Sequence, residues 1–283
     1  MPSPAVQPLL ALIAPHAGGN PTQYVFERAF ADRELDWRYL TFEIEPERLS
    51  AAVQGLKALG FRGGHCADAY QEDVLSLVDR VTDTASQVGA VNVVFREGDV
   101  LVGDNTDGEA VLAAIGRVSD LVGKKIVLLG AGHVARAVAI ALAAVGDLGA
   151  LTVVNRSESR AVDLTNLVAD KFSTPPDVAT WSADYVPPPD ADVLINATRL
   201  GADPHDAALP TPFDALRPGL LVVDVAACRA RTPWLDGASQ RGCQIVDGLT
   251  VFLEQAAIGF RRWTDVEPDR RILREAAEEF LGL

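Results

Sequence analysis

A glycine-rich turn carries the clearest chemical signal in this sequence. After the apolar stretch 126–129, the chain reads Gly130-Ala131-Gly132-His133-Val134-Ala135 and then continues with helical spacing. In a strand–turn–helix setting, this GxGxxA pattern is typical of dinucleotide binding. The first glycine permits the tight turn, the second lets the backbone approach a pyrophosphate, and the alanine allows close helix–strand packing. We expect the phosphates to bind free N–H groups at the helix N-terminus, with His133 either contacting them or facing solvent.

The end of the next predicted strand indicates which dinucleotide binds. The stretch 151–156 is strand-like and leads into Asn155-Arg156-Ser157, with no carboxylate before Glu158. An acidic residue at this place binds the ribose 2′-OH of NAD, whereas an arginine accommodates the 2′-phosphate of NADP. The sequence therefore favours NADP over NAD. The alternative is that Arg156 is only a solvated surface residue.

Several further motifs occur along the chain in a fixed order. They are Gly89-Ala90-Val91-Asn92, Gly103-Asp104-Asn105-Thr106-Asp107, Ile195-Asn196-Ala197-Thr198 with Gly201, and a last group of Asp224, Thr232-Pro233, Gly248-Leu249 and Gln255-Ala256. Together with the glycine turn, their order and spacing resemble the shikimate dehydrogenase family, which includes quinate/shikimate dehydrogenases. The first two motifs, similar to GAVNT…GxNTD, are the most specific.

The resemblance implies a fold and an activity. It implies an N-terminal α/β substrate domain, residues 1–107 with 248–283, and a Rossmann-like NADP domain, residues 108–247, with the substrate in the cleft between them. The implied reaction is hydride transfer between NADP and a ring alcohol or ketone. The implied cofactor-binding residues are Gly130, Ala131, Gly132, His133, Val134, Ala135, Asn155, Arg156, Ser157, Thr198 and Gly248. On the substrate side we expect Asn20, Asn92, Asn105, Thr106 and Gln255.

The proton-transfer residues depart from the family pattern. A segment similar to NVTxPxK aligns with residues 65–71, so that His65 stands for the asparagine, Ala67 for the threonine and Gln71 for the lysine. A glutamine cannot act as an acid or base near neutral pH. The aspartate that partners the lysine in the family is present as Asp107. The chain has only four lysines, Lys57, Lys124, Lys125 and Lys171, and none lies in this segment.

The residues that would bind a substrate carboxylate are also replaced. The family's SxSP aligns with Gly18-Gly19-Asn20-Pro21, and the tyrosine expected after Asp224 aligns with Ala227. Each buried hydrogen-bonding group left without its partner costs roughly 1–3 kcal/mol. Because the losses fall on the substrate side and spare the cofactor motifs, we expect NADP binding with weak or altered activity toward shikimate.

New polar residues could replace the lysine. A histidine ordinarily titrates near neutrality, so His65 could act as acid or base, although a structural or hydrogen-bonding histidine is the favoured interpretation. The predicted catalytic group is therefore Asp107, Gln71 and His65. No His, Cys or carboxylate cluster has recognisable metal spacing, so we expect no metal.

The apolar pattern supplies elements to hold these residues. Strand-like stretches cover 9–14, 37–45, 151–156, 192–198 and 219–226, with a hairpin over 91–105 that turns near Gly98. Helix-like stretches cover 21–35, 46–60, 107–118, 159–172, 249–264 and 268–283; 69–81 is amphipathic, 124–146 is strand, turn and helix, and the proline-rich 173–191 resembles a loop. Alternating strands and helices predict a three-layer α/β fold with parallel sheets covered by helices.

Composition limits the partners. The 283 residues favour two domains, and the formal net charge of -14 argues against nucleic acid and acidic membranes. No apolar stretch is long enough to span a membrane, and the N-terminus lacks a convincing signal peptide. Three scattered cysteines indicate reduced thiols, as in a cytoplasmic protein. We expect a small-molecule substrate; the oligomeric state is open, with a homodimer among the options.

Three functions are compatible with these features. The first is an NADP-dependent dehydrogenase that acts weakly on shikimate or on a different cyclic or carbonyl substrate. The second is a non-catalytic NADP-binding relative, serving as a sensor or partner subunit. The third is an ordinary shikimate dehydrogenase, which would require a different alignment of residues 61–75 with the family pattern and would require Lys57 to reach the cleft.

Overall fold

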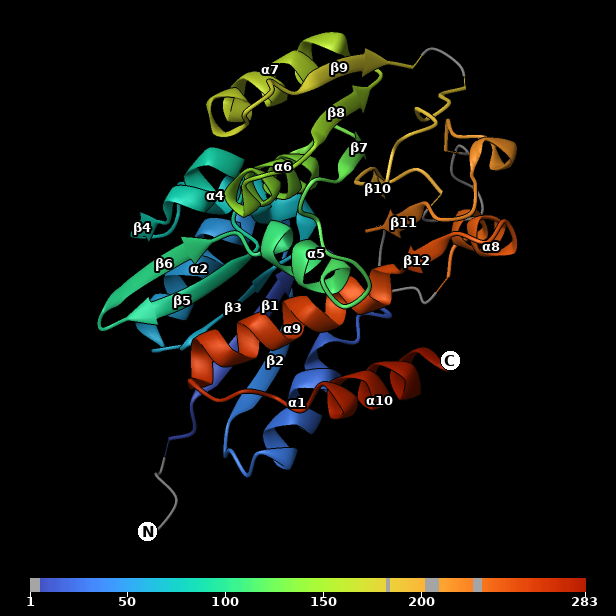
Figure 1. The fold of residues 1–283 in the computed structure, drawn as a ribbon. Helices are drawn as coiled ribbons and strands as arrows, with labels where there is room; N and C mark the ends of the chain where they lie inside the picture. The colour runs from blue at the N-terminus through green and yellow to red at the C-terminus, as the bar shows by residue number, and fades with distance from the viewer. Residues whose placement is uncertain (1–5, 182–183, 202–208, 226–230) are drawn as a thin grey trace. The chain divides into compact units, whose positions relative to one another are not determined.

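A computed structural model describes residues 6–181, 184–201, 209–225 and 231–283. The chain divides into two compact units (Figure 1). Unit 1 comprises residues 1–106 and 255–283, and unit 2 comprises residues 107–254. The sequence-based division places both boundaries slightly differently, at 107/108 and 247/248, and the roles assigned to the two parts stay predictions.

Unit 1 contains a mixed six-stranded sheet. In chain order its strands are β1 (Leu9–Ala14), β2 (Arg38–Glu43), β3 (Gly63–Cys66), β4 (Arg80–Val81), β5 (Val93–Glu97) and β6 (Val100–Asp104). They lie in the order β2-β1-β3-β5-β6-β4, and β5 runs antiparallel to both of its neighbours. The β5–β6 pair is the predicted hairpin, and Gly98 has the positive φ of 60° that its turn requires.

The helices of unit 1 are α1 (Thr22–Asp32), α2 (Leu49–Ala58), α3 (Gln71–Val74), α4 (Asp83–Val88), α10 (Arg270–Leu281) and the C-terminal part of α9 (Gly248–Thr264). The apolar face of α1 is buried, and this helix packs against α10. The amphipathic stretch 69–81 is helical only in its first part, over a short 3₁₀ turn and α3. Its later apolar residues, Leu75, Leu77 and Val78, pack on the core from a turn and not from a helix face.

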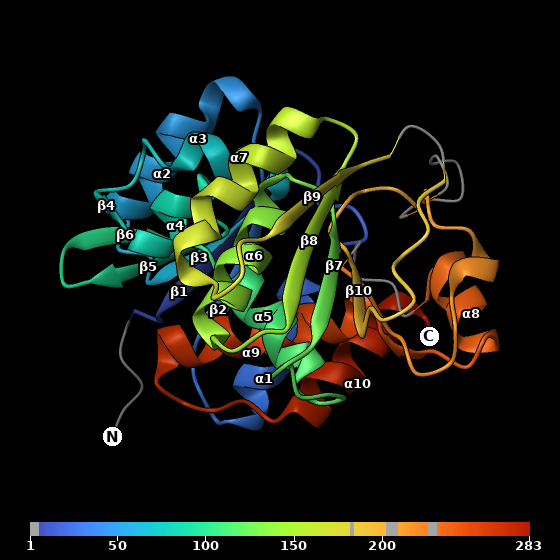
Figure 2. The ribbon, with the colours of Figure 1, turned by 45° about the horizontal axis from the view of Figure 1, so that its top comes forward.

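Unit 2 contains a parallel six-stranded sheet, all of whose strands are labelled in Figure 1 and four of them in Figure 2. Its strands are β7 (Lys125–Leu129), β8 (Ala150–Asn155), β9 (Asp177–Thr180), β10 (Val193–Asn196), β11 (Leu221–Asp224) and β12 (Gln244–Val246), in the order β12-β11-β10-β7-β8-β9. The α-helices are α5 (Asp107–Ile115), α6 (His133–Val145), α7 (Glu158–Val168), α8 (Pro233–Gln240) and the N-terminal part of α9.

The side chains of β7 show why unit 2 forms three layers. Successive residues of a strand point to opposite faces. Ile126 and Leu128 pack in a cluster with residues of α5, α6 and α7, whereas Val127 and Leu129 pack in a second cluster with residues of α8. Helices therefore cover both faces, and the predicted α/β fold is confirmed.

Three elements of unit 2 differ from the sequence-based expectation. The stretch 173–191, interpreted as loop, contains β9, a short strand that pairs with β8. The two prolines directly before it, Pro175 and Pro176, made the stretch resemble a loop. A strand can nevertheless form there, because proline is tolerated at the start of an edge strand. The short elements α8 and β12 were not predicted.

Candidate active site

The glycine turn brings the ends of three strands of unit 2 together. Gly130 follows β7 with a φ of 112°, and its N–H donates to the carbonyl of Val154 on β8 at 2.8 Å. A Cβ atom at Gly130 would lie only 2.9 Å from the carbonyl oxygen of Ala197, just after β10. Both the positive φ and this close approach require glycine, as the motif predicted.

The N-terminus of α6 has a glycine as its N-cap residue, so the N-cap supplies no side-chain hydrogen bond to the first N–H groups. Gly132 is the exposed N-cap residue of this 13-residue helix. The space where a side chain would lie is open, because a Cβ at Gly132 would meet nothing within 4 Å. The first N–H groups of a helix lack intrahelical acceptors and favour an anion. His133 is partly buried, and its Nε2 has no hydrogen-bond partner among the described residues. Ala131 and Ala135 are buried, and Val134 packs against the core.

A basic and hydroxyl-rich corner follows β8. Ser157 caps α7, since its Oγ accepts from the N–H of Arg160 at 3.5 Å, and it also lies 3.0 Å from the Oγ of Ser159. The Nδ2 of Asn155 donates to the carbonyl of Ser157 at 3.0 Å and fixes the turn. The side chain of Arg156 is exposed in this turn. Arginine and serine donors at the start of a helix suit a phosphate.

A buried hydrogen-bond network orients Thr198 near the glycine turn. Asn196 Oδ1 accepts from the N–H and the Oγ1 of Thr198, at 3.0 and 2.7 Å. Asn196 Nδ2 donates to Asp224 at 2.9 Å, and Thr232 Oγ1 donates to the same carboxylate at 2.8 Å. Gly248 is buried at the first residue of α9. Ala227, the residue at the family's tyrosine position, lies outside the described residues.

In unit 1 the predicted amide and hydroxyl side chains meet. Asn92 and Thr106 exchange hydrogen bonds: Asn92 Oδ1 accepts from the Thr106 N–H at 3.0 Å, and Asn92 Nδ2 donates to Thr106 Oγ1 at 3.2 Å. Asn105 Nδ2 donates to the carbonyl of Ala90 at 3.2 Å. All three side chains are buried, and Asp107, also buried, directly follows them as the first residue of α5. Gln255 lies partly buried on α9.

Gln71 lies beside this group. It is hydrogen-bonded to the GAVN motif, because the carbonyl of Gln71 accepts from the N–H of Val91 at 2.7 Å. Its side chain is 4% exposed, and Nε2 donates to the carbonyl of Cys66 and to Asp68 Oδ1, both at 3.3 Å. The other end of the amide, Oε1, is buried without a partner among the described residues. Because Nε2 faces two acceptors, the amide orientation is defined.

His65 lies in an aromatic cluster. Its ring is 4.9 Å from that of Trp263 and 5.6 Å from that of Phe26, and its Nδ1 is 2.8 Å from the hydroxyl of Tyr39. Burial lowers the pKa of His65 to about 4, so the ring is neutral at pH 7. This environment supports the structural or hydrogen-bonding interpretation of His65 that the sequence already favoured.

Two further residues have defined local partners. Asn20 Oδ1 accepts from the N–H of Thr22 at 2.9 Å, so its side chain holds the start of α1. The ammonium of Lys57, the residue on which the third function depends, forms an ion pair with Asp79 at 2.8 Å.

The sequence missed a charged group beside the site. Asp104, at the end of β6, is buried and forms an ion pair with Arg262 of α9. The motif that contains Asp104 gave no hint of this partner, because the two residues are 158 positions apart. Among the described residues, no group of three or more His, Cys, Asp or Glu could hold a metal ion. No helix in the described part of the chain is long and apolar enough to cross a membrane.

Three family models match the chain. They are the shikimate dehydrogenase substrate binding domain over residues 20–94, shikimate / quinate 5-dehydrogenase over 113–201, and the shikimate 5'-dehydrogenase C-terminal domain over 248–278. The shikimate dehydrogenase (NADP(+)) of Moorella thermoacetica is 38% identical over 275 residues, covering 93% of this chain and 92% of that protein. That of Methanothermobacter thermautotrophicus is 33% identical and covers 90% of each chain.

Solved structures are similar over nearly the whole chain. Ligand-free 5-ketofructose reductase of a Gluconobacter species has a TM-score of 0.89 at 33% identity and covers 97% of this chain and 99% of its own. A shikimate dehydrogenase in complex with NADP+ has a TM-score of 0.88 at 27% identity, covering 97% and 96%. The Thermus thermophilus shikimate 5-dehydrogenase in complex with NADP(H) and shikimate has a TM-score of 0.83 at 28% identity, covering 98% and 100%.

Proposed function

The chain belongs to the shikimate and quinate dehydrogenase family, and on that premise we propose that it is an NADP-dependent oxidoreductase acting on a cyclic alcohol or ketone, with weak or altered activity toward shikimate. The observation that carries this proposal is the glycine turn of unit 2. Its tight geometry at Gly130, its open N-cap at Gly132 and the exposed Arg156 after β8 together fit a dinucleotide with a 2′-phosphate.

The residues of unit 2 fit NADP at defined atoms. The N–H groups at the start of α6 would bind the pyrophosphate, and the unpartnered Nε2 of His133 would donate to the same oxygens. Arg156 and Ser157 would hold the 2′-phosphate. When bound, NADP supplies or accepts the hydride. The names of the relatives, which specify NADP(+), support the same cofactor.

The polar residues at the end of β6 and directly after it, together with Asn92, would bind and orient the substrate. Asn92, Asn105 and Thr106 form a buried polar group whose members fix one another, so their remaining hydrogen-bonding capacity is aimed before a ligand arrives. Asp107 would accept a hydrogen bond from the reacting hydroxyl and orient it. Gln71 cannot take the proton, and His65 is a weak base at a pKa of about 4. An ordered water beside Asp107 would then carry the proton to solvent.

Altered substrate choice follows from the residues around Gln71 and Asn20. The Gln71 Nε2 is already engaged by Cys66 and Asp68, and Asn20 Oδ1 is engaged by α1. Neither residue supplies the ammonium or the hydroxyls that the family pattern places there. A non-acidic carbonyl compound would tolerate these changes better than an acid. The similarity to 5-ketofructose reductase makes keto sugars one class to test.

The experiment has two stages. NADP and NAD are first titrated into the protein, and we expect NADP to bind more tightly. Initial rates are then measured with shikimate, quinate and, with NADPH, 5-ketofructose. Turnover of any of these supports the oxidoreductase.

A non-catalytic NADP-binding protein is the second candidate. It is favoured by the absence of a lysine at position 71 and by the enclosed position of His65. NADP binding without turnover of any compound in a broad panel of cyclic alcohols and keto sugars would support this function over the first.

A further inference from the structure

One buried carboxylate lies directly before the polar group of unit 1. Asp104 is the last residue of β6, and its side chain is 8% exposed. Three donors converge on it: the N–H of Asn105 at 2.8 Å, the hydroxyl of Thr82, and the guanidinium of Arg262. The N–H of the next residue, Thr106, donates to Asn92. The backbone between β6 and α5 is therefore fixed residue by residue.

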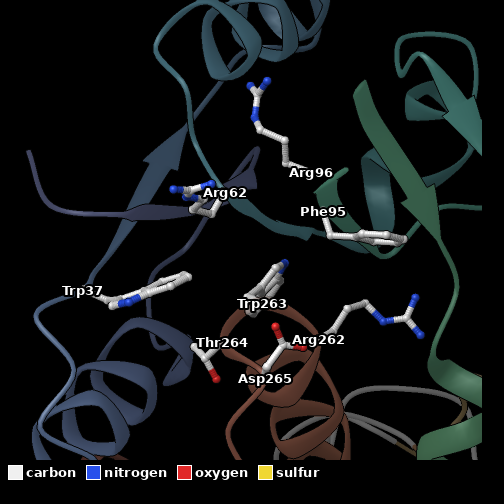
Figure 3. Close-up of a pocket in the computed structure, with 8 residues that line it drawn as sticks. All are labelled: Trp37, Arg62, Phe95, Arg96, Arg262, Trp263, Thr264 and Asp265. Atoms are coloured by element: carbon white, nitrogen blue, oxygen red, sulfur yellow. The ribbon is translucent and has the colours of Figure 1, made fainter. Parts of the chain in front are cut away.

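Of these three donors, Arg262 is the one that carries a positive charge. It lies near the end of α9, and its guanidinium packs over the ring of Phe95 at 5.0 Å from the ring centre. Figure 3 shows the Arg262 side chain leaving α9 beside Trp263 and extending below the ring of Phe95. Removing one partner of a buried ion pair leaves the other charge uncompensated and is strongly destabilising, so Arg262 holds the Asp104 carboxylate in place.

We propose that Arg262 is a positioning residue for the reaction. It acts through Asp104, whose carboxylate sets the direction of the Asn105 N–H and with it the placement of Asn105, Thr106 and Asp107. This inference rests on the proposed function, because these three residues are the ones proposed to bind and orient the substrate. Arg262 itself need not touch the substrate or NADP.

The kinetic test compares two adjacent arginines of α9. Arg262→Ala is expected to lower kcat for the best substrate of the panel by about 10- to 100-fold, the usual cost of misplaced reacting groups, with KM for NADP unchanged. Arg261→Ala is the matched control, because the exposed Arg261 pairs with Glu267 at the surface; its kcat should not change. Arg262→Lys, which keeps the charge but loses the planar fork, should fall between them.

Chemical rescue separates a positioning role from general damage. Arg262 also lines a pocket of about 240 Å³, through which a small cation could reach the space that Arg262→Ala leaves. Millimolar ethylguanidinium should restore part of the lost kcat in Arg262→Ala and have no effect on wild type or Arg261→Ala. An Arg262→Ala enzyme with wild-type kcat would overturn the inference, and so would a lost activity that ethylguanidinium fails to restore.

Hydrogen exchange gives a readout that does not need turnover. In Arg262→Ala, the amides of Asn105 and Thr106 should exchange at least tenfold faster, while those of β7 in unit 2 should be unchanged. Should Arg262→Ala fail to fold, the double variant Asp104→Asn with Arg262→Met removes the unpaired charge and is measured instead. Unchanged exchange at 105–106 refutes this inference alone, whereas a wild-type protein without any turnover refutes the proposed function.

Discussion

Replacing Arg156 with aspartate should reverse the cofactor preference. Arg156 is exposed in the turn between β8 and α7, next to the serines of the α7 N-terminus. A charge-assisted hydrogen bond to a phosphate contributes about 1.5–3 kcal/mol, and the exposure of Arg156 puts its share at the low end. Aspartate would remove that bond and add repulsion of about 1 kcal/mol between two charges several ångströms apart in water. The loss for NADP is thus about 2–3 kcal/mol, or roughly 30- to 150-fold in Kd.

The affinity for NAD should not fall in Arg156→Asp. The new carboxylate at position 156 could accept a hydrogen bond from the free ribose 2′-OH, so NAD binding should tighten or stay constant. The assay is a titration of each cofactor, followed by tryptophan fluorescence or calorimetry. Arg241→Asp is the matched control, because Arg241 is an exposed arginine of unit 2 beside β12, at the other edge of the sheet. An unchanged ratio of the two Kd values in Arg156→Asp would refute the assignment of the 2′-phosphate to this corner.

Three further predictions concern single residues. Gly132→Ala should weaken NADP binding without lowering Tm, because the added methyl meets no protein atom but occupies the side of the N-cap that the pyrophosphate approaches; a lower Tm with unchanged Kd would contradict this. Gln71→Lys should leave kcat/KM for shikimate low, since residues 18–20 still lack the hydroxyls of the family pattern; recovery to a normal rate would show that position 71 alone limits activity. For His65, the folded pKa of about 4 lies below its unfolded value, so the protein should lose stability as pH falls from 7 to 5. His65→Gln, which does not titrate, should remove about 2 kcal/mol of that loss in urea unfolding at the two pH values, and identical pH profiles would contradict the burial of the ring.

The sequence predicted the geometry of the glycine turn, because local backbone requirements leave a local pattern. A tight turn after β7 needs a residue with positive φ and no Cβ, and Gly130 satisfies both. Alternating apolar stretches likewise predicted the α/β fold and most of its strands and helices. The resemblance drawn from the motifs led to the family, and the family models and relatives confirm it.

Features that depend on distant residues could not be predicted in the same way. The aromatic surroundings of His65 come from α1, β2 and α9, so its local sequence gives no sign that the ring is enclosed. The partner of Asp104 lies 158 residues away. The strand β9 was missed because prolines precede it and because a short edge strand needs little apolar pattern.

The residue-level roles stay predictions for a different reason. Hydrogen bonds bring Asn92, Asn105 and Thr106 into one buried group, and the Gln71 backbone joins it through Val91. These hydrogen bonds define where a ligand could bind. Which ligand reacts there depends also on the chemical groups that the ligand itself carries. The residue at position 71 bears most directly on the choice between the two proposed functions, because a glutamine there cannot transfer the proton.

The most direct test is the steady-state rate of NADP reduction by the wild-type protein with saturating shikimate. With Gln71 in place of the lysine and without the family's carboxylate-binding hydroxyls, kcat should lie several orders of magnitude below the ordinary enzyme value of about 10 s⁻¹, while NADP still binds. A kcat near 10 s⁻¹ would contradict the account, because it would show that this site carries out the family reaction without the residues to which that reaction is assigned.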